Sequence, residues 1–288
     1  GEAESRWPVA LLRLGEFWSR RLKPTAVTCG AAISACGKGR QLSQALGVLA
    51  ELNGRQQIPC TTVALGALVD ACAQVAHWQL AQQLLWSMKR ESPEPGVVVC
   101  GAVVSACEKG HQWGSALEVV SAGLLQAALA PNEICLNAAV SACEKGLEWE
   151  QSLRVLQMFK PHMLRPDVVS CSAAVSACAR TPDWQRPLEL LWGLEQGSFA
   201  PNVITFDALI SACGTGQQWQ MALRLVKETQ LVLVEANVVT YCATVGACAA
   251  GRAPQRALGL AADMQQRRVP PNLLVRTTVV TACEVDGC

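Results

Sequence analysis

Residues 202–213 read NVITFDALISAC, and the Ala-Cys pair that closes this stretch recurs eight times along the chain. The eight cysteines follow one another at intervals of 35 or 36 residues and are Cys36, Cys72, Cys107, Cys143, Cys178, Cys213, Cys248 and Cys283. A period of this length is typical of solenoids, in which each unit is too small to bury its own apolar face and stacks on its neighbours. The repeat therefore predicts a functional surface that runs along an array, rather than a single pocket.

Each unit predicts two antiparallel helices, which we call A and B. In residues 133–167 the first half is rich in Ala and other apolar residues, and Gly146 follows it where a helix C-cap belongs. The second half places Leu153 and Leu156 at helical spacing before Pro161 ends the pattern. The unit is therefore expected to be a helical hairpin with a short turn.

Three further positions recur with the cysteine. Tryptophan falls six residues after it, at the start of helix B, at Trp78, Trp113, Trp149, Trp184 and Trp219. Alanine falls nine residues after it, where a small side chain lets helices A and B approach, at Ala45, Ala81, Ala116, Ala222 and Ala257. Most units end in Pro-Asn or Pro-Asp, which supplies a turn and an N-cap for the next helix A.

This register divides the whole chain into one array. We expect seven complete units, at residues 26–61, 62–96, 97–132, 133–167, 168–202, 203–237 and 238–272. Residues 1–25 are expected to form helix B of a truncated unit, and residues 273–288 helix A of another. Both ends of the sequence look cut from a longer array.

Composition argues against several classes of function. The net charge is +1 and only 16% of residues are charged, so strong nonspecific attraction to nucleic acid is not expected. No run of 18 apolar residues predicts a membrane span. The chain has fifteen cysteines but no Cys-x-x-Cys motif, which favours reduced, buried packing residues over metal or redox chemistry. The three histidines lack paired carboxylates, so we expect neither an enzyme nor a cofactor.

Residues 202–213, residues 237–248 (NVVTYCATVGAC) and the closing Pro-Asn or Pro-Asp resemble the pentatricopeptide repeat. The tetratricopeptide repeat has a 34-residue period and displays its Trp in the first helix, whereas here the Trp opens helix B. The resemblance covers essentially the whole chain. It implies an all-α fold, a right-handed α-solenoid superhelix whose A helices line a groove that binds single-stranded RNA, with one base per repeat.

The family resemblance implies a set of apolar residues that clamp the bases, each the second residue of its unit. They are Val27, Val63, Val98, Ile134, Val169, Ile204, Val239 and Leu274. Every one is β-branched or Leu, and the alternative is that these side chains pack helix A against the preceding unit.

Base choice in the family depends on the fifth residue of a unit and on its closing residue. The candidate reading residues at these positions are Asn137, Ser172, Asp207 and Thr277 within helix A, and Asn132, Asp167, Asn202, Asn237 and Asn272 at the close. Asn137 with Asp167 resembles a uracil-reading pair, and Ser172 with Asn202 resembles an adenine-reading pair. Gly30, Gly66 and Gly101 stand at the fifth position of the first three units and offer no side chain, so weak specificity is expected. The alternative for the closing residues is turn chemistry alone.

The resemblance also implies phosphate contacts from a basic residue two places after the repeated cysteine. Lys38, Lys109, Lys145 and Arg180 occupy this position, and each would add a salt-dependent attraction to the strand. The alternative is a solvated cation that stabilises the C-terminus of helix A.

Two functional hypotheses follow. The first is a single-stranded RNA-binding array that acts in organellar RNA processing, stability or translation. The second is a structural or adaptor solenoid docked on proteins within a large organellar complex, such as a ribosome or photosynthetic assembly. The Ala- and Trp-rich repeat with its Ser-Ala-Cys-Glu-Lys-Gly motif resembles arrays of dinoflagellate-type algae, which implies a plastid (chloroplast) or a mitochondrion.

Overall fold

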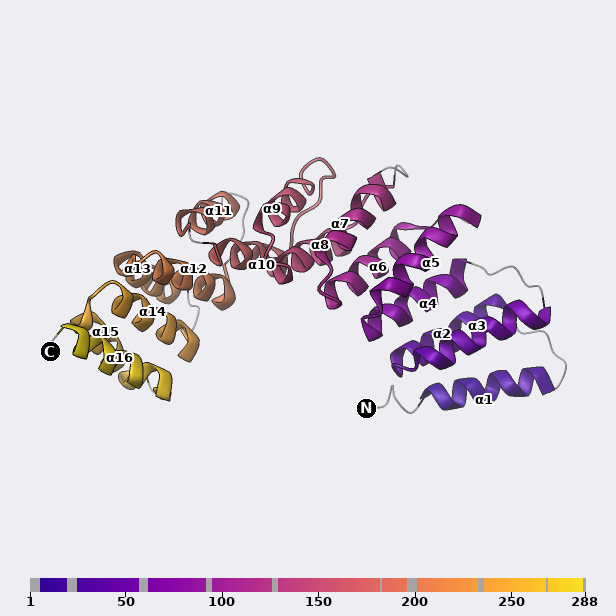
Figure 1. Ribbon diagram of the computed structural model, residues 1–288, viewed down its shortest axis with the longest axis horizontal. Coiled ribbons are helices and arrows are strands. Elements are labelled where there is room, and N and C mark those ends of the chain that lie inside the picture. Colours follow the sequence, from indigo (N-terminus) through magenta and orange to yellow (C-terminus); the bar gives the residue numbers. More distant parts are fainter. Residues whose placement is uncertain are drawn as a thin grey trace. The chain divides into compact units, whose positions relative to one another are not determined.

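The computed structural model describes residues 6–19, 25–56, 62–91, 95–125, 129–181, 183–195, 201–232, 236–267 and 269–286. Every regular element in these ranges is helical, and the helices alternate as A and B along the chain (Figure 1). The chain divides into two compact units, Gly1–Arg165 (unit 1) and Pro166–Cys288 (unit 2).

Unit 1 is a stack of helical hairpins. Its A helices are α2 (Ala26–Lys38), α4 (Thr62–Val75), α6 (Val97–Lys109) and α8 (Glu133–Lys145). Its B helices are α1 (Arg6–Ser19), α3 (Leu42–Gln56), α5 (Trp78–Glu91), α7 (Trp113–Glu118) and α9 (Trp149–Gln157). Each A helix packs on the next A helix, and each of the B helices α1, α3, α5 and α7 also packs on the A helix that follows it.

Unit 2 repeats this arrangement. Its A helices are α10 (Val168–Ala179), α12 (Val203–Thr215), α14 (Val238–Ala250) and α16 (Leu273–Asp286), and its B helices are α11 (Gln185–Glu195), α13 (Trp219–Leu231) and α15 (Pro254–Gln266). Phe206 and Leu209 of α12 share a buried cluster with Leu225 of α13 and Leu188 of α11. The prediction of an all-α solenoid of stacked helical hairpins is confirmed.

Polar caps determine where the A helices begin. The Oδ1 atom of Asn132 accepts a hydrogen bond from the backbone N–H of Cys135 at 2.8 Å, at the N-terminus of α8. Asn237 forms a reciprocal capping box with Thr240 at the start of α14. Such caps satisfy N–H groups that the helix itself leaves unpaired, typically for about 1 kcal/mol each.

The glycine at the end of helix A has a role that the sequence did not predict. Gly146 has φ −82°, which any residue adopts, and the next residue, Leu147, takes the left-handed conformation at φ 62°. A Cβ atom on Gly146 would lie 2.2 Å from Cδ1 of Trp113, which comes from helix B of the preceding repeat. The glycine is therefore needed for space rather than for backbone freedom.

This tryptophan-on-glycine contact recurs along both units. A Cβ atom would lie 2.2 to 2.5 Å from the indole in each of the pairs Trp7–Gly39, Trp78–Gly110, Trp113–Gly146, Trp184–Gly216 and Trp219–Gly251. Where the tryptophan position holds Leu42 or Pro254, the corresponding glycine position holds Val75 or Asp286. Thr181 occupies the glycine position that follows Trp149 in the sequence. The two residue types therefore occur largely as pairs in successive repeats.

The Cys and Ala positions that recur in each repeat form the interior of the array. The described cysteines of the eight-fold position are fully buried free thiols, and burial raises the pKa of Cys107 and Cys143 to about 12. The alanines nine residues further on are fully buried as well, and Ser152 takes this place in α9. The interpretation of these cysteines as reduced packing residues agrees with their burial.

One B helix departs from the expected α-helix. After α7, residues Val119–Leu125 form a π-helical segment, η1. The carbonyl oxygen of Ala122 in this segment accepts a hydrogen bond from Nζ of Lys89, at 2.5 Å. A π-helical turn leaves the backbone less regularly bonded, and the lysine supplies a partner from the preceding repeat.

Candidate nucleic-acid interface

The second residue of each A helix is apolar, and it faces solvent in the seven A helices where its side chain is described. The exposed fractions of Val27, Val63, Val98, Ile134, Val169, Ile204 and Val239 lie between 54% and 79%. Because consecutive A helices pack side by side within each unit, these residues form a row along the N-terminal ends of the A helices, which we call the apolar row. These side chains are open to a ligand, and both base clamping and packing of helix A against the preceding unit stay predictions. The side chain of Leu274 lies outside the described residues.

Gly30, the fifth residue of its repeat, lies beside Val63 of the apolar row. A Cβ atom on Gly30 would lie 3.2 Å from Cγ1 of Val63. Residues two and five of a helix are three apart and therefore share a face. The predicted clamping and base-reading positions thus belong to one surface in this part of unit 1.

In unit 2 the structure brings Ser172 and Asn202 together. The Oγ atom of Ser172 lies 3.2 Å from Oδ1 of Asn202 and 2.8 Å from Oγ1 of Thr205. Oδ1 of Asn202 also accepts hydrogen bonds from the backbone N–H and the hydroxyl of Thr205, both at 2.9 Å. Ser172 is only 3% exposed, whereas Asn202 is half-buried.

Asp207 and Asn237 form a similar group in the next repeat. The hydroxyl of Thr240 donates a hydrogen bond to Oδ1 of Asp207 at 2.5 Å and also lies 3.3 Å from Oδ1 of Asn237. Burial raises the pKa of the Asp207 carboxyl, and hydrogen bonds from Thr240 and Asn237 oppose this rise. Thr205 and Thr240, the third residues of their units, were not identified from the sequence. The Asn-x-x-Thr spacing, which resembles a capping box, was the available signal.

The last two polar positions are more loosely arranged. Sγ of Cys242 lies 3.4 Å from Oδ1 of Asn272, which caps α16 by accepting from the N–H of Val275. Thr277 is exposed and its hydroxyl donates to the carbonyl oxygen of Leu273 at 3.0 Å.

The structure does not define a reading pair for Asn137 and Asp167, and Asn132 has no polar partner at the fifth position of its own repeat. Asn132 caps α8 and closes a repeat whose fifth residue is Gly101. Asn137 is half-buried, and its Oδ1 atom is buried without a hydrogen-bond partner among the described residues. Asp167 belongs to unit 2 and caps α10 by accepting from the N–H of Ser170 at 2.7 Å. The uracil-reading pair Asn137–Asp167 therefore stays a prediction.

The predicted phosphate contacts lie at the opposite end of the A helices. Lys38 follows Val27 by eleven residues, which corresponds to about 16 Å along a helix axis. Lys38, Lys109 and Arg180 are exposed. Nζ of Lys145 instead lies 2.9 Å from Oε1 of Glu108, which also accepts a hydrogen bond from Ser141 at 2.8 Å. Lys145 thus connects α8 to α6, and its contact with a phosphate stays a prediction.

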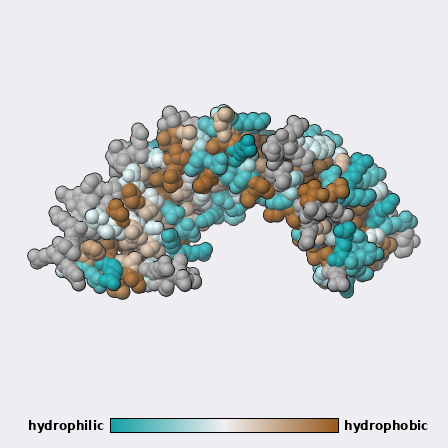
Figure 2. Space-filling model, turned by 180° about the vertical axis from the view of Figure 1, so that it is seen from behind, coloured by the Kyte–Doolittle hydropathy of each residue, from teal (hydrophilic) through white to brown (hydrophobic). Residues whose placement is uncertain are grey.

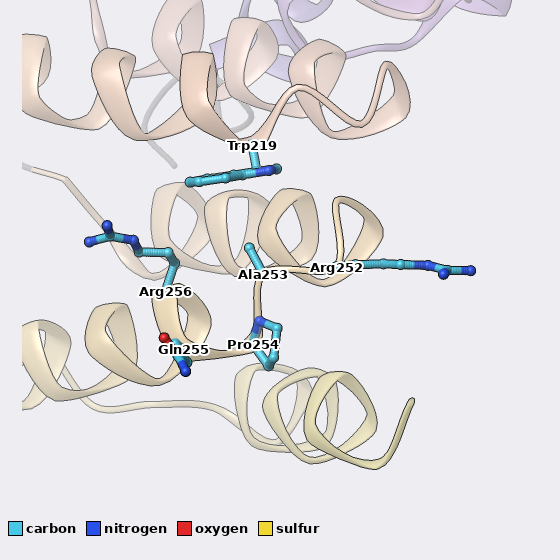
Figure 3. A pocket seen from close by; sticks show the side chains of 6 residues that line it. All are labelled: Trp219, Arg252, Ala253, Pro254, Gln255 and Arg256. Carbon is cyan, nitrogen blue, oxygen red and sulfur yellow. The ribbon is translucent and has the colours of Figure 1, made fainter. Parts of the chain in front are cut away.

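A shallow hollow lies where Pro254 replaces the usual tryptophan. It is lined by Trp219, Arg252, Ala253, Pro254, Gln255 and Arg256. Figure 3 shows the Trp219 ring lying over Ala253, with the two arginine side chains pointing to opposite sides. Because the guanidinium groups do not converge, the hollow lacks the geometry of a built anion site.

Hydrophobic residues also reach the surface away from the apolar row. Trp192, Leu231 and Leu258 of the B helices in unit 2 are each about half or more exposed. On the face shown in Figure 2, brown hydrophobic areas are separated by teal hydrophilic ones.

In the part of the chain that the structure describes, no group of three or more His, Cys, Asp or Glu residues is placed to hold a metal ion. None of the described helices combines the length and the apolar character that a membrane crossing requires.

Comparisons with known proteins agree on the fold. A family model of the pentatricopeptide repeat domain matches residues 154–216. The sequence matches no curated protein.

Three solved structures show the likeness. The pentatricopeptide repeat protein PPR10 in complex with an 18-nucleotide psaJ RNA element aligns over 96% of this chain with a TM-score of 0.78 and 16% identity. PPR10 from maize aligns over the same share with a TM-score of 0.77 and 15% identity. The chain spans only 40% and 39% of these two proteins.

The pentatricopeptide repeat domain of Arabidopsis thaliana protein-only RNase P 1 in complex with tRNA gives a TM-score of 0.51 at 12% identity, over 60% of this chain and 90% of that domain. These identities are low, so the likeness concerns the fold. Residues 154–216 therefore match the pentatricopeptide repeat, and the described chain has the fold of pentatricopeptide repeat proteins.

Proposed function

We propose that the protein binds single-stranded RNA along the apolar row, with one base per repeat. The observation that carries this proposal is the exposure of seven apolar β-branched side chains at the same helical position of successive repeats. Exposed apolar residues that recur in one line mark an interaction surface, because each is costly to leave in water. Unstacked bases are flat, largely apolar on their faces and spaced regularly along a strand.

The comparisons support an RNA partner. PPR10 shares the fold over nearly the whole chain, and its structure contains an RNA element. The structure of the RNase P 1 domain contains tRNA. We further propose that the protein acts in RNA processing, stability or translation in a plastid or mitochondrion, and that it binds RNA without catalysing a reaction.

Base selection is expected to reside mainly in unit 2. Gly30, Gly66 and Gly101 leave three repeats of unit 1 without a reading side chain. In unit 2, hydrogen bonds join the two members of the reading pair Ser172–Asn202 and of the pair Asp207–Asn237. The protein should therefore tolerate many sequences while preferring particular bases at a few adjacent positions.

The decisive experiment replaces three members of the apolar row, Val169, Ile204 and Val239, by Ser. These side chains are exposed, so the fold should be little affected, and each loses about 1 kcal/mol of contact with RNA. Affinity for labelled single-stranded RNA of random sequence should fall about a hundredfold in a fluorescence anisotropy titration.

The matched control is the double variant Leu231→Ser and Leu258→Ser, which removes exposed apolar residues from the B helices of the same unit. It should bind RNA as the unchanged protein does. The proposal fails if the unchanged protein binds no single-stranded RNA at low salt, or if both variants lose affinity equally.

A second candidate function is that of an adaptor within an organellar protein complex. It is favoured by the glycine-filled reading positions of unit 1 and by the exposed Trp192 and Leu231. An adaptor would co-purify with defined proteins after nuclease treatment, and the Leu231→Ser variant would lose them while the apolar-row variant would not.

A further inference from the structure

The side-chain amide of Asn202 has a fixed orientation. A backbone N–H group can only donate, so the amide atom that meets the N–H of Thr205 at 2.9 Å must be the oxygen, Oδ1. The hydroxyl of Thr205 meets the same oxygen at 2.9 Å. Because Oδ1 is held by two groups of Thr205, the amide nitrogen Nδ2 is the end that remains for a ligand.

Ser172 is joined to this arrangement rather than to solvent. Its hydroxyl has one hydrogen and lies within hydrogen-bond distance of the Val168 carbonyl at 2.6 Å, Oγ1 of Thr205 at 2.8 Å and Oδ1 of Asn202 at 3.2 Å. All three partners are protein groups, and the side chain is almost fully buried. A base that stacks over the apolar row would meet Asn202, which is half-buried, before it could meet Ser172.

We propose that Thr205, together with Ser172, is a positioning residue for base choice in the repeat 168–202: it holds Asn202 so that Nδ2 presents a hydrogen-bond donor to the base. The inference rests on the proposed RNA-binding function. It gives Asn202 a hydrogen-bond donor for the base, and it makes a residue of the following repeat part of the reading unit.

The next repeat has a comparable contact at Thr240. Its hydroxyl contacts both Oδ1 of Asp207 and Oδ1 of Asn237, and the side chain of Asn237 also hydrogen-bonds to Asp207. In the repeat after that, Val275 stands at the corresponding position, and the reading group is Cys242 with Asn272. In unit 2, a threonine therefore follows the two pairs whose fifth residue carries an oxygen atom, Ser172 and Asp207. Val275 follows the pair whose fifth residue is Cys242.

The test is a selection of bound sequences from a randomised single-stranded RNA library, followed by sequencing. Thr205→Val keeps the shape of the side chain but removes the hydroxyl. It should flatten the base preference at one position of the selected motif, from about tenfold to near unity, and leave the other positions intact. Thr240→Val should flatten the adjacent position instead.

Two further variants separate positioning from folding. Thr205→Ser restores a hydroxyl and should restore the preference. Thr229→Val removes a buried hydroxyl of α13 that donates a hydrogen bond to the carbonyl of Val226 in its own helix, and it should change no position of the motif. The inference is overturned if Thr205→Val retains the full preference, or if it weakens binding equally for all sequences. An unchanged protein that selects no RNA overturns the proposed function itself, and this inference with it.

Discussion

The contact between tryptophan and glycine makes a quantitative prediction for Gly146→Ala. The added Cβ atom would lie 2.2 Å from Cδ1 and 2.7 Å from Cγ of Trp113. Ordinary carbon contacts are about 3.5 to 4 Å, so the indole must withdraw by more than 1 Å. Such overpacking typically costs about 1 to 3 kcal/mol.

A smaller effect acts in the opposite direction. Gly146 has φ −82°, so Ala fits the backbone, and its lower entropy in the unfolded chain contributes about 0.4 to 1 kcal/mol of stability. The net expectation is a loss of about 1 to 2 kcal/mol in the free energy of unfolding. In a Trp113→Ala background only the contact with Cβ of residue 113 at 3.1 Å remains, so Gly146→Ala should become close to neutral.

Urea titrations followed by circular dichroism on the four members of this double-mutant cycle give the coupling energy, expected at about 2 kcal/mol. Gly47→Ala is the control, because a Cβ atom there has no neighbour within 4 Å, and it should stabilise α3 by up to about 1 kcal/mol. The reasoning is refuted if Gly146→Ala destabilises the protein equally with and without the tryptophan.

Three further predictions concern buried groups. Ser152→Ala should raise the free energy of unfolding by about 1 kcal/mol, because the buried Ser152 hydroxyl has no partner among the described residues; a loss of stability in thermal unfolding would contradict this. Burial, reinforced by Asp263, raises the pKa of Tyr241 to about 12 from 10.0, so the stability that this group contributes is complete below pH 10 and is lost as the pH rises through 12. Tyr241 is the only tyrosine, so its tyrosinate absorbance reports this titration directly, and a midpoint near 10 would refute it. Among the described cysteines, half-buried Cys242 should react first with iodoacetamide in the native protein, as measured by mass spectrometry, and the fully buried thiols only on unfolding.

The sequence was sufficient to predict the hairpins, because local signals agree at every repeat. Asn202, which closes the repeat 168–202, does cap α12, and the alanine positions are buried. The π-helical segment after α7 was not predictable from periodicity, since apolar residues in a wider turn still face the core. The purpose of Gly146 was also missed, because its neighbour, Trp113, lies in a different repeat.

The candidate site was predictable in its positions but not in its contacts. The spacing placed Ser172 and Asn202 at reading positions, and they do meet. It could not show that Ser172 is buried, or that Thr205 holds the amide, because both depend on how one repeat packs on the next. For the same reason the pairing of Lys145 with Glu108 was not foreseen.

The pairing of each indole with a glycine in the following repeat limits how modules of this array can be recombined. Where a tryptophan packs as Trp78 does, the next repeat needs a residue without a side chain at the end of its A helix, as Gly110 is. Leu42 needs no such successor, and Val75 follows it. Engineers who transplant or reorder these repeats must therefore exchange neighbouring repeats together, because the tryptophan of one repeat must match the glycine position of the next.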